Sequence, residues 1–194
     1  MLSDMYERYV TEAIVLGSKP RKEADRVLDL LTHDFGLVQA RGISLRVEKS
    51  KMRYSLQDLA LVDVDLVRGR DVWRVAGARA HDVFWKGNDA GLQAFARIAR
   101  LARRLVQGEE RHEELFDVLK SARSAFESQE LDPVLTELLS AARVLHVLGY
   151  LSDKALGTVL FTHTTFAVQD LAEAASLREK LRSSVNSAIS ETHL

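Results

Sequence analysis

The sequence changes its pattern near residue 80, and this change constrains the fold more than any other feature. Before that point, short apolar segments alternate with turn residues such as those at 17–20, 33–36 and 68–71. From about residue 88 onward, apolar residues recur at the 3.6-residue spacing of an amphipathic helix. The pattern therefore predicts an α+β chain with two domains, a β domain over residues 1–80 and a helical domain over residues 81–194.

The first 80 residues predict a small barrel. We expect strands over residues 11–16, 27–31 and 37–40, a further strand within 56–67, and a returning strand over 72–76. Several short strands at this spacing, joined by turns, are typical of a closed β-barrel. We interpret Phe35 and Trp73 as residues of its core.

The second half predicts four helices, over residues 90–107, 111–127, 133–149 and 169–191. Asp132 followed by Pro133 is the favoured order at a helix start, because the acid caps the helix and proline suits its first turn. Residues 151–168 look irregular, with a short hairpin expected around 159–168.

The bulk composition excludes several classes of protein. The chain of 194 residues is 46% hydrophobic and 28% charged, which is ordinary for a folded domain. It has no cysteine, so neither disulfides nor thiolate metal sites can form. No apolar stretch approaches the roughly 20 residues of a membrane span, and the polar N-terminus does not resemble a signal peptide. We expect a cytoplasmic protein, associated with the nucleoid and not with a membrane.

A basic stretch at residues 40–53 stands out against a chain that is nearly neutral, with 27 Lys and Arg against 28 Asp and Glu. Only Glu48 opposes its five cations, which are Arg41, Arg46, Lys49, Lys51 and Arg53. A local positive patch on a neutral protein favours phosphate as the partner. Tyr54 follows directly and could stack on a base. The competing interpretation is a solvated loop that happens to be basic.

A second basic cluster precedes it. Its cations are Lys19, Arg21, Lys22 and Arg26, interrupted by Glu23 and Asp25. Asp25 could simply pair with a neighbouring arginine. Since aromatic residues are sparse in this half, any nucleic-acid binding should depend on phosphate contacts, respond to salt and show little sequence preference.

Other constellations remain open or absent. Arg97, Arg100 and Arg104 share one face of the first long helix, where they could extend a DNA track, meet an acidic partner tail or only face solvent. The histidines lack zinc-helix spacing, and no phosphate-binding glycine loop or nucleophile elbow occurs. We therefore predict no catalytic residues, no metal site, no cofactor and no enzyme.

The order of several short motifs resembles the bacterial recombination mediator family RecO over about residues 9–80. The matching segments are 12–16, 23–26, 31–32 with Gly36, 40–42, 49–51, 56–57 and 64–73, and the segment 145–150 resembles the helix before the family's zinc-binding loop. The resemblance implies a five-stranded OB-fold barrel followed by an all-α domain. It also implies binding of single- and double-stranded DNA, annealing of complementary strands, and loading of recombinase onto strands coated by single-strand-binding protein. RecR and single-strand-binding protein are the partners that it implies.

One departure from the family is plain. Many members carry a four-cysteine zinc site in the helical half, whereas this chain has no cysteine and only a short stretch at 151–168. The resemblance therefore predicts a variant without zinc. This departure keeps a second hypothesis open, a protein-interaction adaptor that retains the barrel without binding DNA. A nuclease on the same scaffold finds no ligand constellation to support it.

Overall fold

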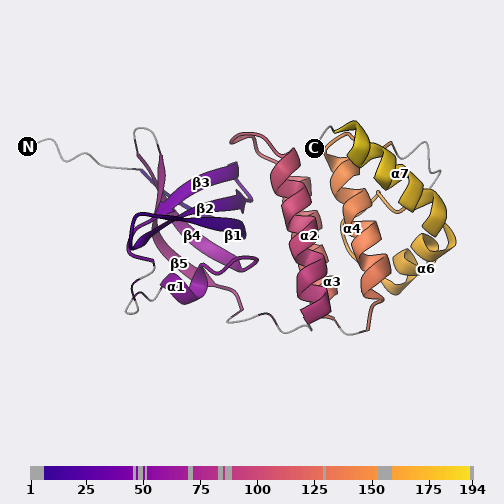
Figure 1. The fold of residues 1–194 in the computed structure, drawn as a ribbon, viewed down its shortest axis with the longest axis horizontal. Helices are drawn as coiled ribbons and strands as arrows, with labels where there is room; N and C mark the ends of the chain where they lie inside the picture. Colours follow the sequence, from indigo (N-terminus) through magenta and orange to yellow (C-terminus); the bar gives the residue numbers. More distant parts are fainter. Residues whose placement is uncertain are drawn as a thin grey trace, which may run out of the picture. The chain divides into compact units, whose positions relative to one another are not determined.

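A computed structural model describes residues 7–45, 47, 50, 52–69, 72–82, 85, 89–128, 130–152 and 159–192. The chain divides into two compact units (Figure 1). One unit comprises residues 1–84 together with 107–112, and the other comprises residues 85–106 and 113–194. Each unit is described by itself below.

The first unit is a closed five-stranded barrel, as predicted. Its elements are β1 (Arg8–Arg21), β2 (Asp25–Thr32), β3 (Gly36–Gly42), the short helix α1 (Met52–Ser55), β4 (Leu61–Arg68) and β5 (Trp73–Ala80). The strand order is β1-β2-β3-β5-β4, and closure comes from the antiparallel pair of β1 with β4 and the parallel pair of β3 with β5. This arrangement is the OB-like topology.

Apolar side chains at alternate positions of the strands fill the interior of the barrel. In β4, Val62, Val64 and Leu66 are buried, whereas Asp63 and Asp65 between them are partly exposed. Trp73 is also buried, and its ring lies edge-on to Tyr9 with the two centroids 5.5 Å apart. Phe35 packs against this core while remaining partly exposed. The interpretation of Trp73 and Phe35 as core residues is therefore confirmed.

The segment 107–112 lies far from the barrel in sequence but packs against it. The indole N–H of Trp73 donates to Glu109 Oε1 at 2.9 Å, and Arg111 lies 3.9 Å from Asp34. Gly36, with a φ of +65°, makes the closest approach, since a Cβ built there would lie 1.8 Å from the carbonyl oxygen of Glu110. Glycine is required at this position by both its backbone conformation and the lack of space.

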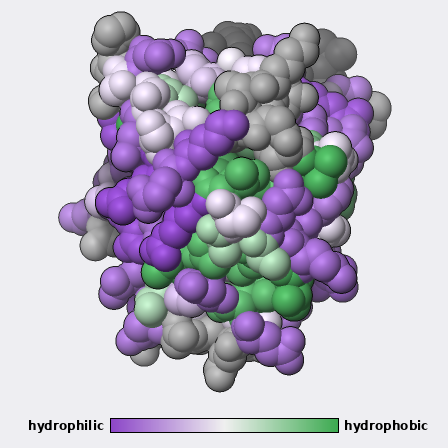
Figure 2. Space-filling view, turned by 90° about the vertical axis from the view of Figure 1, so that its right-hand side faces the viewer, coloured by the Kyte–Doolittle hydropathy of each residue, from purple (hydrophilic) through white to green (hydrophobic). Residues whose placement is uncertain are grey.

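The second unit is all-helical. It contains α2 (Asp89–Leu105), α3 (Glu113–Glu127), α4 (Pro133–Val147), α6 (Val168–Ser176) and α7 (Arg178–Glu191). Asp132 caps α4 as predicted, because its carboxylate accepts hydrogen bonds from the main-chain N–H groups of Val134 at 2.8 Å and Leu135 at 3.3 Å. Figure 2 shows that the face towards α6 and α7 carries an apolar patch with hydrophilic residues around it.

Four local expectations differ from the structure. Residues 17–20 belong to β1 and not to a turn, because the strand continues past a register shift between Val15 and Gly17 and pairs with β2 up to Arg21. The strand expected within 56–67 begins only at Leu61. The last helix is divided at Leu177, and the described residues of the expected hairpin, 159–168, contain no strand.

Candidate nucleic-acid interface

The turn after β3 is built around a buried carboxylate. The Asp25 side chain, 8% exposed, accepts hydrogen bonds from Arg41 Nε at 3.0 Å and from the main-chain N–H of Ser44 at 2.9 Å. Ser44 has a φ of +54°, a conformation that costs energy for a residue other than glycine. Gly42 leaves the space that the buried Leu45 fills, since a Cβ there would lie 2.1 Å from Leu45 Cδ1. Asp25 therefore fixes the start of the basic stretch.

These contacts also change the electrostatics of the turn. The hydrogen bond from Ser44, followed by that from Arg41, lowers the pKa of Asp25 below its ordinary value, because both stabilise the charged carboxylate. Asp25 thus stays ionised and neutralises Arg41. Asp25 does pair with an arginine, but its partner is Arg41 on the next strand and not an arginine adjacent in sequence, and this contact holds Arg41 within the fold.

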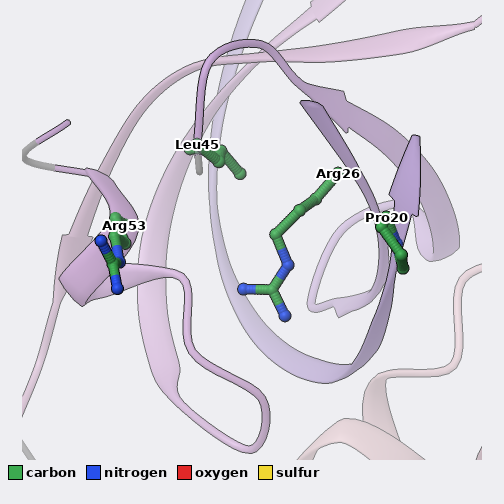
Figure 3. A pocket seen from close by; sticks show the side chains of 4 residues that line it. All are labelled: Pro20, Arg26, Leu45 and Arg53. Atoms are coloured by element: carbon green, nitrogen blue, oxygen red, sulfur yellow. The ribbon is translucent and has the colours of Figure 1, made fainter. Parts of the chain in front are cut away.

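A pocket of about 490 Å³ opens beside this turn, and Pro20, Arg26, Leu45 and Arg53 line it (Figure 3). It brings together the end of β1, the start of β2, the turn after β3 and α1. Two of its four lining residues are arginines, and Figure 3 shows their side chains entering from different parts of the chain. Pro20 and Leu45 supply apolar walls. A site with cationic and apolar walls can accept a phosphate beside a base or sugar.

Arg26 is not a free cation either. Its Nη2 atom donates to the hydroxyl of Ser18 and lies 3.3 Å from Asp58 Oδ1. The hydroxyl of Ser18 in turn donates to the same oxygen of Asp58 at 2.6 Å. Neither Ser18 nor Asp58 was predicted, because they lie far apart in sequence and only the fold brings them to Arg26.

The remaining predicted cations at the hairpin tip face solvent. Lys19, Arg21 and Lys22 are exposed where β1 turns into β2, and Lys22 has a φ of +56°. In the described part of the chain, neither Lys19 nor Arg21 forms an ion pair. These side chains are open to an external anion.

The short helix α1 carries the other exposed pair. Arg53 is exposed and its guanidinium carbon lies 6.0 Å from the centre of the Tyr54 ring. Tyr54 is 62% exposed, and Ile43 and Val47 in the preceding segment are also exposed apolar residues. Apolar side chains within a basic surface provide contacts for unpaired bases. Arg46, Lys49 and Lys51, the other three predicted cations, lie outside the described residues.

A groove of about 730 Å³ lies on the helical unit between α2, α4 and α7. Its apolar lining includes Ile98, Leu101, Leu138, Val185 and Ile189, and its arginines are Arg97, Arg100, Arg104, Arg178 and Arg182. Glu137 also lines it and binds Arg97 through two hydrogen bonds, of 2.5 and 2.7 Å. The arginine stripe predicted on the first long helix therefore borders a groove, and α7 contributes two further arginines.

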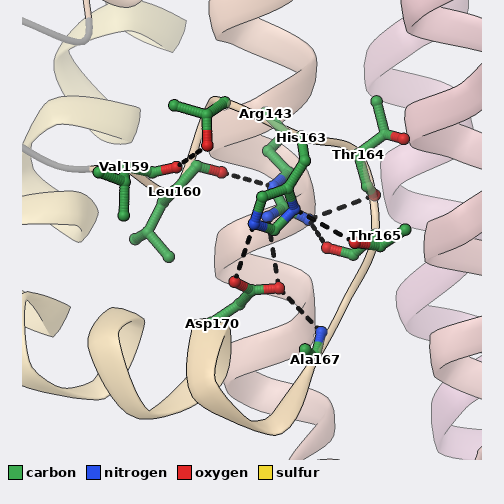
Figure 4. Close-up of polar contacts among 9 residues, drawn as sticks. Arg143, Val159, Leu160, His163, Thr164, Thr165, Ala167 and Asp170 are labelled. Carbon is green, nitrogen blue, oxygen red and sulfur yellow. Dashed lines mark hydrogen bonds and ion pairs between the residues drawn. The ribbon is translucent and has the colours of Figure 1, made fainter.

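An arginine organises residues 159–170, which follow the helix that resembles the one before the family's zinc-binding loop (Figure 4). Arg143 in α4 is 1% exposed and donates to the carbonyl oxygens of Leu160 at 2.8 Å and Thr165 at 2.6 Å. Asp170 lies 3.7 Å from this guanidinium, accepts from the main-chain N–H of Ala167 and caps α6. Burial lowers the pKa of Arg143 from its ordinary value. Its carbonyl partners surround a guanidinium, so this donor set does not fit zinc, and the described residues contain no group of three or more metal-ligating side chains.

These features define the class of protein. It combines a closed barrel of OB-like topology, which carries a basic surface, with a helical unit. Residues 5–84 match the family model "Recombination protein O N terminal". The chain is 28% identical to the DNA repair protein RecO of Desulfitobacterium hafniense (strain DSM 10664 / DCB-2) over 145 residues, which cover 73% of this chain and 52% of that relative. It is 37% identical to DNA repair protein RecO of Dehalococcoides mccartyi (strain CBDB1) over 76 residues, covering 39% of this chain and 30% of the relative.

Residues 5–84 therefore match the N-terminal domain of the RecO family, and the resemblance seen in the motifs of this half is confirmed. This match agrees with the prediction that the protein is not an enzyme. The chain spans about half the length of the first of these curated relatives. Within the described parts of the chain, no helix combines the length and apolar composition needed to cross a membrane.

Proposed function

We propose that this protein is a DNA-binding recombination mediator in DNA repair. In this role it anneals complementary strands and assists recombinase loading on strands coated by single-strand-binding protein. The observation that carries the proposal is the match of the barrel to the RecO N-terminal domain, whose relatives are named DNA repair proteins. The mechanism involves no covalent chemistry. Cations neutralise the phosphates of two strands, so that the strands meet at less electrostatic cost.

The proposed DNA site is the basic surface of the barrel. It comprises Lys19, Arg21, Lys22, Arg26, Arg41, Arg46, Lys49, Lys51, Arg53 and Tyr54. Exposed cations at the hairpin tip and on α1 support direct phosphate contacts, and Tyr54 supports stacking on unpaired bases. The pairing of Arg41 with Asp25 supports a structural role for Arg41, with a smaller share in binding.

Charge reversal tests this site. Arg53→Glu should weaken binding of a labelled single-stranded oligonucleotide about tenfold or more and lower the slope of log K against log salt by about 0.7, because one phosphate contact is lost. Arg79→Glu is the matched control, since Arg79 is an exposed arginine on β5 that pairs with Asp63. The triple reversal of Lys49, Lys51 and Arg53 should also abolish annealing. Unchanged affinity and annealing in that triple variant would refute the site.

The groove on the helical unit supports the partner half of the proposal. Among the described residues that line it, the arginines outnumber the one acid and several side chains are apolar, so the groove suits an acidic segment that also carries apolar side chains. We propose that single-strand-binding protein supplies this segment and that RecR is a further partner. Reversing Arg100 and Arg104 to Glu should weaken binding of single-strand-binding protein while DNA affinity stays unchanged. Unaltered binding of that protein would contradict the assignment.

The same groove favours the second candidate function, an adaptor that keeps the barrel without binding DNA. The intramolecular pairing of Arg26 and Arg41 also favours it, because paired cations attract phosphate less strongly. The adaptor predicts no DNA affinity even at low salt, together with a stable protein complex. Salt-dependent DNA binding by the wild-type chain would exclude it.

A further inference from the structure

Two carboxylates, those of Asp25 and Asp58, contact arginines of the proposed DNA site. They differ in whether main-chain or only side-chain groups bind them. Asp25 is buried and accepts a main-chain N–H, so it belongs to the fold. Asp58 is 51% exposed, and its partners in the described part of the chain are two side chains, the hydroxyl of Ser18 and the guanidinium of Arg26. The Asp58 contacts can therefore exchange with solvent or ligand, whereas those of Asp25 cannot.

Backbone hydrogen bonds bring the turn that carries Asp58 to the strand beside Arg26. The N–H of Leu59 donates to the carbonyl of Val15 at 2.7 Å, and the N–H of Val15 donates to the carbonyl of Ala60 at 3.0 Å. These bonds tie the turn at 58–59 to β1, the strand that carries Ser18. An asparagine at position 58 would keep the turn, because an exposed ion pair contributes little to stability.

The groups around Asp58 are those that bind a DNA phosphate. Arginine and serine side chains are common phosphate donors, and a carboxylate oxygen accepts from the same groups in similar geometry. Since Arg26 lines the pocket of Figure 3, its guanidinium is already directed at the space where a strand would enter. We propose that Asp58 occupies the place of a backbone phosphate on Arg26 and that DNA must displace it. This inference rests on the proposed DNA-binding function and makes Asp58 the residue that limits affinity.

The exchange has a distinct signature in salt. When Arg26 leaves Asp58 for a phosphate, the freed carboxylate takes up a cation, so this contact releases no net counterion. In Asp58→Asn the same contact releases one, which steepens the slope of log K against log salt by about 0.7 for single strands. Loss of one unit charge about 4 Å from the phosphate tightens binding about fivefold at low salt.

A displaceable competitor also suits a protein that must release annealed strands. Among variants of one interface, affinity changes reside mostly in the dissociation rate. Asp58→Asn should therefore slow dissociation about fivefold while association changes less. The native carboxylate would then speed release of the strand.

The experiment compares the full 194-residue chain with its Asp58→Asn variant by fluorescence anisotropy of a labelled single-stranded oligonucleotide across a salt series. Asp65→Asn is the matched control. It removes the same charge from an ion pair with Arg8, whose distance is 3.1 Å. Asp65 is the strand partner of Val10, which lies near the opposite end of β1 from Pro20. We expect tighter binding and a steeper slope in Asp58→Asn alone. Unchanged or weaker binding in that variant, or equal tightening in Asp65→Asn, would overturn the inference.

A double-mutant cycle tests the route through Arg26. In an Arg26→Gln background, Asp58→Asn should tighten binding less than twofold, and an undiminished fivefold effect would contradict the exchange. Failure of this inference is distinguishable from failure of the proposed function. If Arg53→Glu weakens binding while Asp58→Asn changes nothing, only the inference fails. Absence of binding by both wild type and Asp58→Asn overturns both.

Discussion

Replacing Gly36 by alanine should release the segment 107–112 from the barrel. Gly36 has a φ of +65°, and a Cβ there would lie 1.8 Å from the carbonyl oxygen of Glu110 and 2.6 Å from its carbonyl carbon. The obstacle is backbone, which cannot rotate away as a flexible side chain can. The carbonyl oxygen would have to withdraw by 1.6 Å, from 1.8 Å to the 3.4 Å at which ordinary contact begins.

The cost of this substitution has two parts. A left-handed conformation costs an L-residue about 1–2 kcal/mol. Withdrawal of the segment also breaks the 2.9 Å hydrogen bond between Trp73 and Glu109, worth about 1 kcal/mol. We expect Gly36→Ala to lower the free energy of unfolding of the barrel unit by about 2–3 kcal/mol.

Gly108→Ala provides the matched control within the same unit. Gly108 also has a positive φ, +76°, but nothing lies within 4 Å of the position that a Cβ would take there. It should therefore show only the conformational cost of about 1–2 kcal/mol. Urea unfolding would be followed by tryptophan fluorescence in a Trp85→Phe background, where Trp73 is the one remaining tryptophan. Equal losses of stability in the two variants would refute the close packing of 107–112 on the barrel.

Three further outcomes follow from single contacts. Arg143→Met should lower the free energy of unfolding of the helical unit by about 3–5 kcal/mol in urea, because it removes the buried guanidinium beside Asp170 and the donor to the carbonyl oxygens of Leu160 and Thr165; a loss below about 1 kcal/mol would contradict this role. Asp132→Ala should cost about 1 kcal/mol through loss of the α4 cap, measured in the same way, and no loss would argue against that cap. The pKa of Asp25 is lowered in the folded protein, so its contribution to stability is present above the ordinary carboxyl pKa and is lost as pH falls through the lowered value. Asp25→Asn should therefore lower the urea midpoint at neutral pH and flatten its acid dependence, and an unchanged pH profile would contradict the assignment.

The barrel was predictable because apolar core residues alternate with more exposed residues along its strands. In β4, every second residue from Val62 to Leu66 is apolar, and this pattern fixes which face turns inward. The end of β1 was not predictable in the same way. Gly17, Ser18 and Pro20 are turn-forming residues, and only their pairing with β2 keeps them in a strand. The tertiary partner overrides the local preference there.

Long-range contacts account for the other misses. Nothing in residues 107–112 indicates that they pack on the barrel, because the contact depends on Gly36 and Trp73 more than 30 positions earlier. The division of the last helix at Leu177 carries no glycine or proline to mark it. A sequence pattern reports local periodicity and is silent on such contacts.

The clusters of cations could be recognised in the sequence, but whether each cation forms an ion pair could not. Asp25 lies one residue from Arg26 in sequence, yet it pairs with Arg41 across the β2–β3 ladder. Arg26 instead meets Asp58, which no spacing rule connects to it. Charge counts therefore located clusters of cations, and the fold alone distinguishes the paired cations from the open ones among the described residues.

The salt dependence of DNA binding by the wild-type chain decides whether this protein gathers strands through their phosphates. Affinity for a labelled single-stranded oligonucleotide would be measured from low to physiological salt, with complementary-strand annealing followed in the same buffers. We predict that the logarithm of the binding constant falls linearly with the logarithm of the salt concentration, with a slope that corresponds to several phosphate contacts. Annealing should fail at the salt concentrations at which binding is lost. Affinity that is absent at low salt, or that does not change with salt, would contradict the proposed function.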